Sequence, residues 1–353
     1  MTNESSSELV IRRLYQVTQD HSKGFEHQLL ELLKMGLERF DLDIAILSKI
    51  DQNKYVVKYC VTPDEVPLNP NDCFDLNATY CSMTCNAKGP VGIEHMGEDD
   101  ALAVHPAYQA FGLESYIGIP IRLNGQLYGT LNFSSPTPYP RMFRDVDIDA
   151  LQLMASWVEV ELIRREQEAQ LKALNKELHH LANFDSLTNV PNRRGMHQTL
   201  HKDLNRLSRS QGHGTIALLD IDRFKQLNDT YGHQAGDDAL VAIAEKITQS
   251  LRDYDFVARF GGEEFLLWLP DTAQEECSIV CKRVMENIAT IGITAEPITV
   301  SIGACHFRFN QFKPDDMSKL IDNIISEADT VLYEAKAQGR NRLNSVTKVL
   351  SAD

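Results

Sequence analysis

The segment from Trp157 to Leu181 limits the possible architectures of this chain more than any other feature. It holds no glycine and no proline, so nothing in it interrupts a helix. Mostly apolar positions recur at alternating four- and three-residue intervals, which is the seam spacing of a coiled coil. A long helix in the middle of 353 residues divides the chain, and we expect a domain on each side of it. The seam positions are Leu153, Trp157, Val160, Arg164, Gln167, Leu171, Leu174, Leu178 and Leu181.

Two arrangements fit this helix. It can pair with a second copy in a parallel two-stranded coiled coil, or it can lie alone on its own domain as an amphipathic helix. The charged residues beside the seam favour the coiled coil, because they suit a helix that is solvated on three sides. Two polar seam positions lower the stability of such a pair and can fix its register, as a switchable connector requires. The flanking charged residues are Glu166, Glu168, Lys172, Lys176 and Glu177.

Charge and hydropathy exclude several classes of partner. The net charge is −15 and both halves of the chain are acidic, which argues against binding to duplex nucleic acid. No apolar run has the length of a membrane span, and residues 1–9 lack the pattern of a signal peptide, so we expect a cytoplasmic protein without a membrane partner. An acidic protein that binds phosphates needs a metal ion or a local basic cluster.

The seven cysteines indicate a reducing compartment, because their number is odd and no secretory signal accompanies them. Cys277 and Cys281 are four apart in a predicted helix, and Cys81 and Cys85 are four apart in a predicted loop. Neither pair has the further cysteines or histidines that a zinc site needs. We therefore expect buried or neutral thiols.

The first half of the chain alternates helix and strand patterns. Residues 8–40 and 143–165 have helical spacing, and strands over 44–50 and 55–61 flank a predicted hairpin turn at 51–54. Residues 62–105 are irregular, and a loop of that length is usually functional or mobile. Strands over 116–123 and 126–133 are joined by Asn124 and Gly125, a pair that favours a type I′ turn.

This layout resembles a GAF domain over about residues 20–165. The resemblance depends on residues 115–121 (SYIGIPI), 125–135 (GQLYGTLNFSS) and 147–157 (DIDALQLMASW). It implies a sensory domain with an antiparallel sheet, but it leaves the ligand open: the family binds cyclic nucleotides, bilins, haem or amino acids, and some members bind nothing known. Cys73, Cys81, Cys85 and His95 lie in the long insertion without the Cys-His motif of bilin-attaching members. Cys81 is either an attachment or redox point or a buried structural thiol, and we favour the latter.

Acidic side chains in the second half follow two predicted strands. The strand over 214–222 ends in Asp220 and Asp222, and two apolar arms within 256–270 meet at a Gly261-Gly262 turn that precedes Glu263 and Glu264. Carboxylates at converging strand ends suit a divalent cation. The polar run over 228–236 is predicted to be a loop that leads into a helix over 237–251, and a further strand covers 298–306.

The helix predicted from residue 317 has a basic end. It places Lys336 and Arg340 four apart, on one face. They form either a basic cluster for a polyphosphate or a pair of cations that complement the helix dipole.

Five motifs occur in order in this half of the chain: residues 185–188 (DSLT), 191–194 (PNRR), 220–237 (DIDRFKQLNDTYGHQAGD), 261–265 (GGEEF) and 333–336 (YEAK). Together they resemble a GGDEF domain, of the diguanylate cyclase family, over about residues 176–349. Glu263 stands where the family's name has Asp, and active members carry either carboxylate. The resemblance implies an α/β (α+β) fold of the ferredoxin-like, palm type. We expect a GAF sensory domain over 8–160, a coiled-coil linker over 161–182 and a GGDEF domain over 183–349.

The GGDEF resemblance also implies an activity and a set of site residues. The activity is that of a bacterial nucleotidyltransferase, in which a homodimer condenses two GTP molecules to cyclic di-GMP and two pyrophosphates. Mg²⁺ or Mn²⁺ is the implied cofactor, with a two-ion site. Its implied ligands are Asp220, the carbonyl of Ile221, Glu263 and Glu264, while Glu263 also helps to deprotonate the 3′-hydroxyl. Lys225 is the second implied catalytic residue beside Glu263, and it stabilises the transition state. The implied substrate-binding residues are Asn228 and Asp237 for guanine, His233 near the nucleotide, and Lys336 and Arg340 for the phosphates.

Arg252 and Asp255 carry the Arg-x-x-Asp spacing of the family's inhibitory product site, where cyclic di-GMP binds. The alternative is a helix C-terminus with a favourable cation. Two other functions compete with that of an active cyclase gated by its GAF domain. One is a non-catalytic receptor for cyclic di-GMP or GTP, and the other is a cyclase that makes a different dinucleotide. The intact acidic and basic site residues argue against the receptor, and Asp237 argues for guanine.

Overall fold

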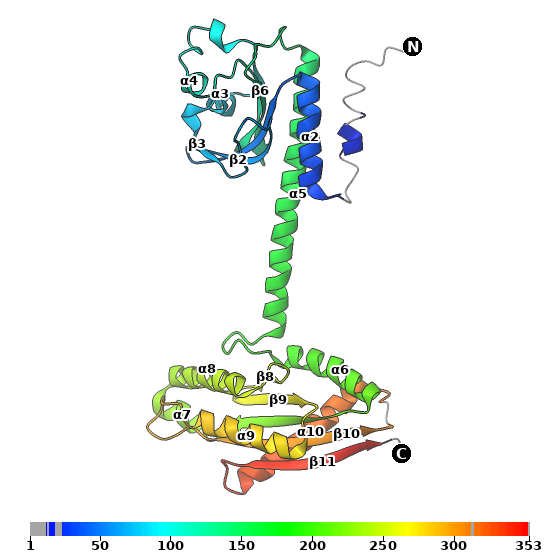
Figure 1. Cartoon of the computed structure of the whole chain (residues 1–353). Helices are drawn as coiled ribbons and strands as arrows, with labels where there is room; N and C mark the ends of the chain where they lie inside the picture. Colours follow the sequence, from blue (N-terminus) through cyan, green and yellow to red (C-terminus); the bar gives the residue numbers. More distant parts are fainter. Residues whose placement is uncertain (1–11, 13, 18–22, 312–313, 352–353) are drawn as a thin grey trace. The chain divides into compact units, whose positions relative to one another are not determined.

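The computed structural model describes residues 12, 14–17, 23–311 and 314–351. The chain divides into two compact units, Met1–Lys172 and Ala173–Asp353. Helix α5 (Asp145–Asn183) begins in the first unit and ends in the second, and Figure 1 shows it as one unbroken helix. Across the described residues, no helix combines the length and the apolar character that a bilayer crossing needs.

The first unit is built on a six-stranded antiparallel sheet with strand order β3-β2-β1-β6-β5-β4. Its strands alternate in side-chain direction, so each face buries its own cluster. Helix α2 (Gly24–Phe40) and the first turns of α5 cover one face, whereas α3 (Cys81–Asn86) and α4 (Pro106–Phe111) lie against the other. The strands are β1 (Ile44–Asp51), β2 (Lys54–Val61), β3 (Cys73–Asp75), β4 (Val91–Ile93), β5 (Ser115–Leu123) and β6 (Gln126–Ser135).

Both hairpins predicted in this unit are confirmed. Asn124 and Gly125 have φ angles of 51° and 82°, as a type I′ turn requires. The continuous helix predicted over 8–40 is wrong, because α2 begins at Gly24, whose φ of 78° lies outside the helical region. Residues 8–11, 13 and 18–22 of that prediction lie outside the described residues.

The long insertion at 62–105 is more regular than predicted. It contains β3, α3 and β4, and Cys81 and Cys85 lie in helix α3 rather than in a loop. Both thiols are buried, as are those of Cys277 and Cys281, so the expectation of buried cysteines is confirmed for these four. Cys73 is exposed.

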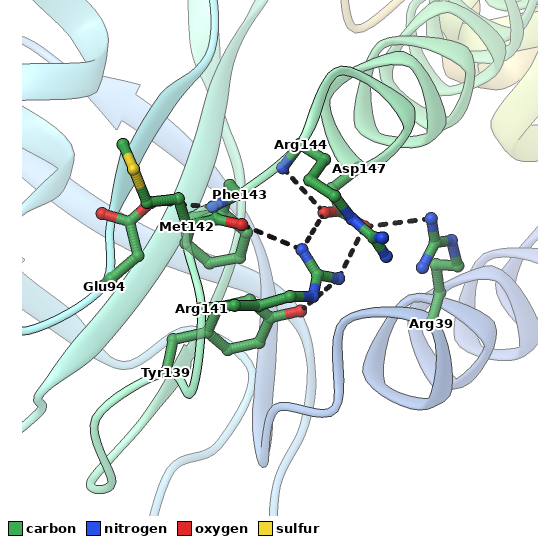
Figure 2. Close-up of polar contacts among 8 residues, drawn as sticks. All are labelled: Arg39, Glu94, Tyr139, Arg141, Met142, Phe143, Arg144 and Asp147. Atoms are coloured by element: carbon green, nitrogen blue, oxygen red, sulfur yellow. Dashed lines mark hydrogen bonds and ion pairs between the residues drawn. The ribbon is translucent and has the colours of Figure 1, made fainter.

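A buried carboxylate joins helix α5 to the rest of the first unit. Asp147 is fully buried, and both its oxygens are paired: Arg141 donates to Oδ2 at 2.6 Å and to Oδ1 at 3.2 Å, and Arg39 Nη2 lies 2.9 Å from Oδ1 (Figure 2). Burial alone would raise the pKa of Asp147, but the hydrogen bonds from Arg141 and the Arg144 amide and the charge of Arg39 lower it. The start of α5 is therefore fixed to the C-terminal turn of α2.

The second unit has a five-stranded sheet with order β11-β10-β7-β9-β8. Strands β7 to β10 form the antiparallel ferredoxin-like arrangement, and β11 adds a parallel edge strand. Alternate residues of β7 point to opposite clusters, Leu219 toward α8 and α9 and Leu218 toward α6 and α10. The elements are α6 (Arg193–Ser210), β7 (His213–Ile221), α7 (Phe224–Tyr231), α8 (His233–Ser250), β8 (Phe256–Gly261), β9 (Glu264–Pro270), α9 (Gln274–Ile288), β10 (Val300–Asn310), α10 (Met317–Ala337) and β11 (Leu343–Ser351).

The mixed α/β class and the strands predicted here are confirmed, but the loop predicted over 228–236 is wrong. Helix α7 covers its first part and α8 begins at His233, with Gly232 alone between them. The many polar residues of this stretch reflect two solvent-facing helices rather than a loop.

Candidate functional site

Asp220 lies near the end of β7, on the sheet face that α6 and α10 cover. Since alternate residues share a face, Asp220 points the same way as Leu218, toward α10. Lys336 in the last turn of α10 meets it, with Nζ 2.7 Å from Asp220 Oδ2. The carboxylate is only 7% exposed, so the ion pair compensates a charge that has lost most of its water.

Further carboxylates gather around Asp220. Glu264 is its cross-strand partner in β9, and Glu263 precedes Glu264 in the turn between β8 and β9. Burial raises the pKa of Asp220, and the negative charges of Glu263 and Asp222 add to this while Lys336 opposes it. Burial and the charge of Asp220 likewise raise the pKa of Glu264. Bringing in a further cation would relieve this repulsion.

This donor set has the chemistry of a hard-cation site. It offers carboxylate oxygens and the carbonyl of Ile221, which are the ligands that Mg²⁺ prefers. Within the described part of the chain, no three Asp, Glu, His or Cys side chains are already arranged to hold a metal ion. The structure thus brings Asp220 and Glu264 together as a pair, with Glu263 close enough to influence their protonation.

Asp222 has a structural role that the sequence did not reveal. Its carboxylate accepts hydrogen bonds from the hydroxyls of Thr299 (2.8 Å) and Ser301 (2.7 Å) and from the backbone amide of Asn341 (3.0 Å). Asp222 thereby ties the end of β7 to β10 and to the loop that follows α10. That loop carries Arg340.

The prediction that Lys336 and Arg340 share one helix face is wrong. Helix α10 ends at Ala337, and Gly339 and Arg340 have φ angles of 118° and 65°, which no right-handed helix permits. Arg340 instead lines a pocket of about 540 Å³ together with Asp222, Arg223 and residues 294–299. Lys336 remains on the helix, bound to Asp220.

Asn228 in α7 packs against α8 at Gly236. A Cβ atom at position 236 would lie 1.9 Å from Asn228 Oδ1, so only glycine permits this approach. That oxygen is buried and has no hydrogen-bond partner among the described residues, which leaves an acceptor unsatisfied. Asp237 directly follows Gly236. The two residues predicted to bind guanine, Asn228 and Asp237, therefore lie at or next to the contact between α7 and α8.

Lys225, His233 and Asp237 are exposed on α7 and α8. In the part of the chain that the structure describes, no hydrogen bond or ion pair joins them to the carboxylates around Asp220. Their side chains face solvent. The structure therefore groups the predicted site residues into the Asp220 cluster and the α7–α8 surface.

Arg259 in β8 is a positioning residue that sequence reasoning missed. Its guanidinium donates to the carbonyl of Gly262 from two nitrogens, at 2.9 and 2.7 Å, and to Asp185 Oδ1 at 2.9 Å. Burial alone would raise the pKa of Asp185, but hydrogen bonds from Thr188 and Arg259 lower it. Arg259 therefore connects the DSLT motif to the turn that presents Glu263.

The second predicted ligand site, at Arg252 and Asp255, is not a simple helix end. Helix α8 stops at Ser250, and Arg283 donates to the Ser250 carbonyl at 3.1 Å, so Arg283 supplies the cation at this terminus. Arg252 is exposed and donates to the Tyr254 hydroxyl at 2.7 Å. Asp255 Oδ2 accepts from the Arg252 amide, while its buried Oδ1 has no partner in the described residues. Burial raises the pKa of Asp255.

Comparison with known proteins matches each of the two units to a family model. Residues 182–342 match the family model described as diguanylate cyclase, GGDEF domain, and residues 26–162 match that of the GAF domain. The diguanylate cyclase DgcM of Escherichia coli is 37% identical over 174 residues, which are 49% of this chain and 40% of that protein. The diguanylate cyclase DgcP of Pseudomonas aeruginosa is 37% identical over 161 residues, 45% of this chain and 23% of that protein.

Among solved structures, the coiled coil and GGDEF domain of DgcB from Caulobacter crescentus, in complex with c-di-GMP, is 27% identical, with a TM-score of 0.46. The match covers 53% of this chain and 99% of that one. The chain spans less than half the length of DgcM and of DgcP.

Replacing Arg259 tests its positioning role. We expect Arg259→Gln to lower the free energy of local opening at residues 258–266 by about 1–3 kcal/mol, because it leaves Asp185 and the Gly262 carbonyl without their donor. Hydrogen–deuterium exchange of peptides that cover these residues measures this. The control is Arg206→Gln, which removes an exposed pair with Asp271 and should change the opening free energy by less than about 1 kcal/mol. Equal exchange in both variants would show that Arg259 does not hold the turn.

Proposed function

Because the chain carries a GAF domain followed by a GGDEF domain, we propose that it is a diguanylate cyclase, which condenses two GTP molecules into cyclic di-GMP and two pyrophosphates. The observation that carries this proposal is the cross-strand pair of the buried Asp220 and the half-buried Glu264, with Lys336 bound to Asp220. Phosphoryl transfer depends mainly on positioning and on neutralising charge, and this site supplies adjacent carboxylates and a cation.

Asp220, Glu263, Glu264 and the carbonyl of Ile221 would hold Mg²⁺ or Mn²⁺, in a two-ion site. The bound ions supply neutralisation of phosphate charge and a more acidic 3′-hydroxyl. Glu263, in the turn between β8 and β9, helps to deprotonate that hydroxyl as a general base.

Basic residues bind the phosphates in this proposal. Lys336 and Arg340 hold the β- and γ-phosphates, although Arg340 does so from the loop after α10 rather than from the helix. The substrate offers Lys336 a second anion besides Asp220. Lys225 is exposed at the start of α7 and stabilises the transition state.

Asn228 and Asp237 recognise the guanine base. The unpartnered oxygen of Asn228 supports this assignment, because a donor on the base would satisfy a buried acceptor. Asp237 accepts two donors from the guanine edge, which adenine does not offer. His233, at the start of α8, lies beside the nucleotide.

Catalysis requires a homodimer, since one domain holds one nucleotide and two equivalent bonds must form. The second half of α5 supports pairing: its apolar seam residues are 52–63% exposed within one chain. Trp157 instead stacks on Phe25 in its own unit, and Arg164 is bound by Glu161 and Glu168 of the same helix. Val160 is also exposed, at 65%, but it lies between these two engaged positions, so we place the coiled coil mainly after Gln167. The exposed seam residues there are Leu171, Leu174, Leu178 and Leu181.

Removing the Glu263 carboxylate tests the enzyme assignment. Glu263→Gln should lower kcat for cyclic di-GMP formation by about 10²–10⁴-fold, because the proton acceptor and a metal ligand are lost together. Chromatographic product analysis with GTP and Mg²⁺ measures this, and circular dichroism checks the fold. Glu286→Gln, an exposed change on α9, is the control and should keep the wild-type rate. A folded Glu263→Gln protein with the wild-type rate would refute the assignment. A parallel assay of the parent protein with ATP tests for a cyclase that makes a different dinucleotide. Absence of product from the parent with GTP would indicate a non-catalytic receptor.

Product feedback is the second part of the proposal. Arg252 offers an exposed guanidinium, and Asp255 offers an unpartnered oxygen for a guanine edge of cyclic di-GMP. We expect Arg252→Ala to keep the initial rate and to weaken inhibition by added cyclic di-GMP by roughly tenfold or more, the value of a hydrogen bond to a charged group. Inhibition curves measure this, with Arg209→Ala, an exposed arginine on α6, as the control. A variant as sensitive as the parent would rule out this site.

Gating by the GAF domain is the third part. A single helix from Asp145 to Asn183, fixed to its unit by Asp147, can transmit rotation where a flexible linker cannot. In this arrangement a ligand needs to prefer one register of the seam by only about 1–3 kcal/mol to change activity several-fold or more.

Insertions between Arg165 and Leu171 test this gating. Insertions of about one heptad should preserve activity. Insertions of about half a turn should abolish it, because a half turn rotates one end of the helix against the other. Cyclic di-GMP production at a fixed dimer concentration, over inserts of one to seven residues, gives the phase. A smooth decline with insert length would show that the linker is a passive tether.

A further inference from the structure

We propose that the pocket in the first unit binds a small, uncharged and largely apolar molecule, without a covalent bond. This inference deepens the gating part of the proposed function and depends on it only for the effect of the ligand on activity. Binding itself is tested without GTP.

The pocket lies on the sheet face that α3 and α4 cover. Its volume of about 370 Å³ is at the small end of the range for ligand sites. Strands β1, β2, β5 and β6, helices α3 and α4 and the loop at 63–68 all contribute to its wall. Its large lining side chains include Ile46, Tyr55, Leu68, Phe74, Tyr80, Phe111 and Tyr116.

No cationic side chain lines this pocket in the described part of the chain. Among the described lining residues there is no lysine, arginine or histidine, and their one carboxylate, Asp43, is exposed and accepts a hydrogen bond from Ser135. Burial raises the pKa values of Tyr55, Tyr80 and Tyr116, which keeps their hydroxyls neutral. Placing a phosphate or carboxylate here would cost its hydration with no compensating cation. The lining therefore favours an uncharged ligand over a cyclic nucleotide.

The polar groups of the pocket are largely bonded to the protein itself. The Asn132 amide donates to the Tyr55 hydroxyl at 3.3 Å and to Thr130 at 3.1 Å. The Tyr116 hydroxyl bonds to Thr84 at 2.6 Å, and the Tyr80 hydroxyl donates to the Leu113 carbonyl at 3.0 Å. A ligand thus gains its affinity mainly by burying apolar surface.

Cys81 also lines the pocket, but it is unsuited to attachment chemistry. Its thiol is buried, and burial raises its pKa, so the reactive thiolate is scarce at neutral pH. The Asn132 amide and the Tyr116 hydroxyl contact the sulfur at 3.4 and 3.6 Å. The favoured prediction of a structural thiol agrees with this environment.

Two fluorescent probes with one ring system test the ligand class. N-phenyl-1-naphthylamine is neutral, and 8-anilino-1-naphthalenesulfonate carries an added sulfonate. Titrated into the full chain without GTP, the neutral probe should bind at least tenfold more tightly. Equal or tighter binding of the sulfonate would overturn the proposal.

Variants then assign the binding to this pocket. Ile46→Phe fills it and should weaken binding of the neutral probe at least tenfold, whereas Val104→Phe, an exposed change outside the pocket, should not. Phe111→Arg is a second pocket variant, in case Ile46→Phe does not fold. It should fold because position 111 is half exposed. It should raise the affinity for the sulfonate at least tenfold. Unchanged probe binding in both pocket variants would overturn the proposal, and because no step requires catalysis, an inactive cyclase would not affect it.

Discussion

The ion pair between Asp220 and Lys336 is the contact on which the arrangement of the second unit's site depends. A strand end with several carboxylates is tolerable in a nearly buried position only with a cation beside it. The pair fixes α10 to β7, and the cross-strand register then places Glu264 opposite Asp220. Asp222, two residues on, holds the loop after α10 through Asn341. The contacts of Asp220 and Asp222 thus hold β7, β9, α10 and the loop after α10 together at this site.

Local patterns in the sequence were enough to predict several of the regular elements. The Asn124-Gly125 pair predicts its turn because few other residues adopt positive φ at both positions. The helical spacing predicted from residue 317 is confirmed by α10 as far as Ala337. Family motifs led to the carboxylates of the site, which lie on adjacent strands as expected.

The sequence did not predict the contacts between residues that are far apart in the chain. Arg259 meets Asp185 across 74 residues, and Asp222 meets Asn341 across 119, so no local spacing indicates either pair. Arg340 was assigned to a helix because its spacing from Lys336 fits, yet Gly339 ends the helical path before it. The polar residues of 228–236 suggest a loop. They belong instead to two exposed helices, which are separated only by Gly232.

The parallel pairing of β11 with β10 has a consequence for synthesis. Residues 343–351 reach their place only after α10 has crossed the sheet, so the second unit cannot complete its sheet until residue 351 has left the ribosome. The sheet of the first unit is complete by Ser135. The nascent chain can therefore fold the first unit while the second is still being made. During translation, the pocket of the first unit can therefore form before the carboxylate site of the second unit is complete.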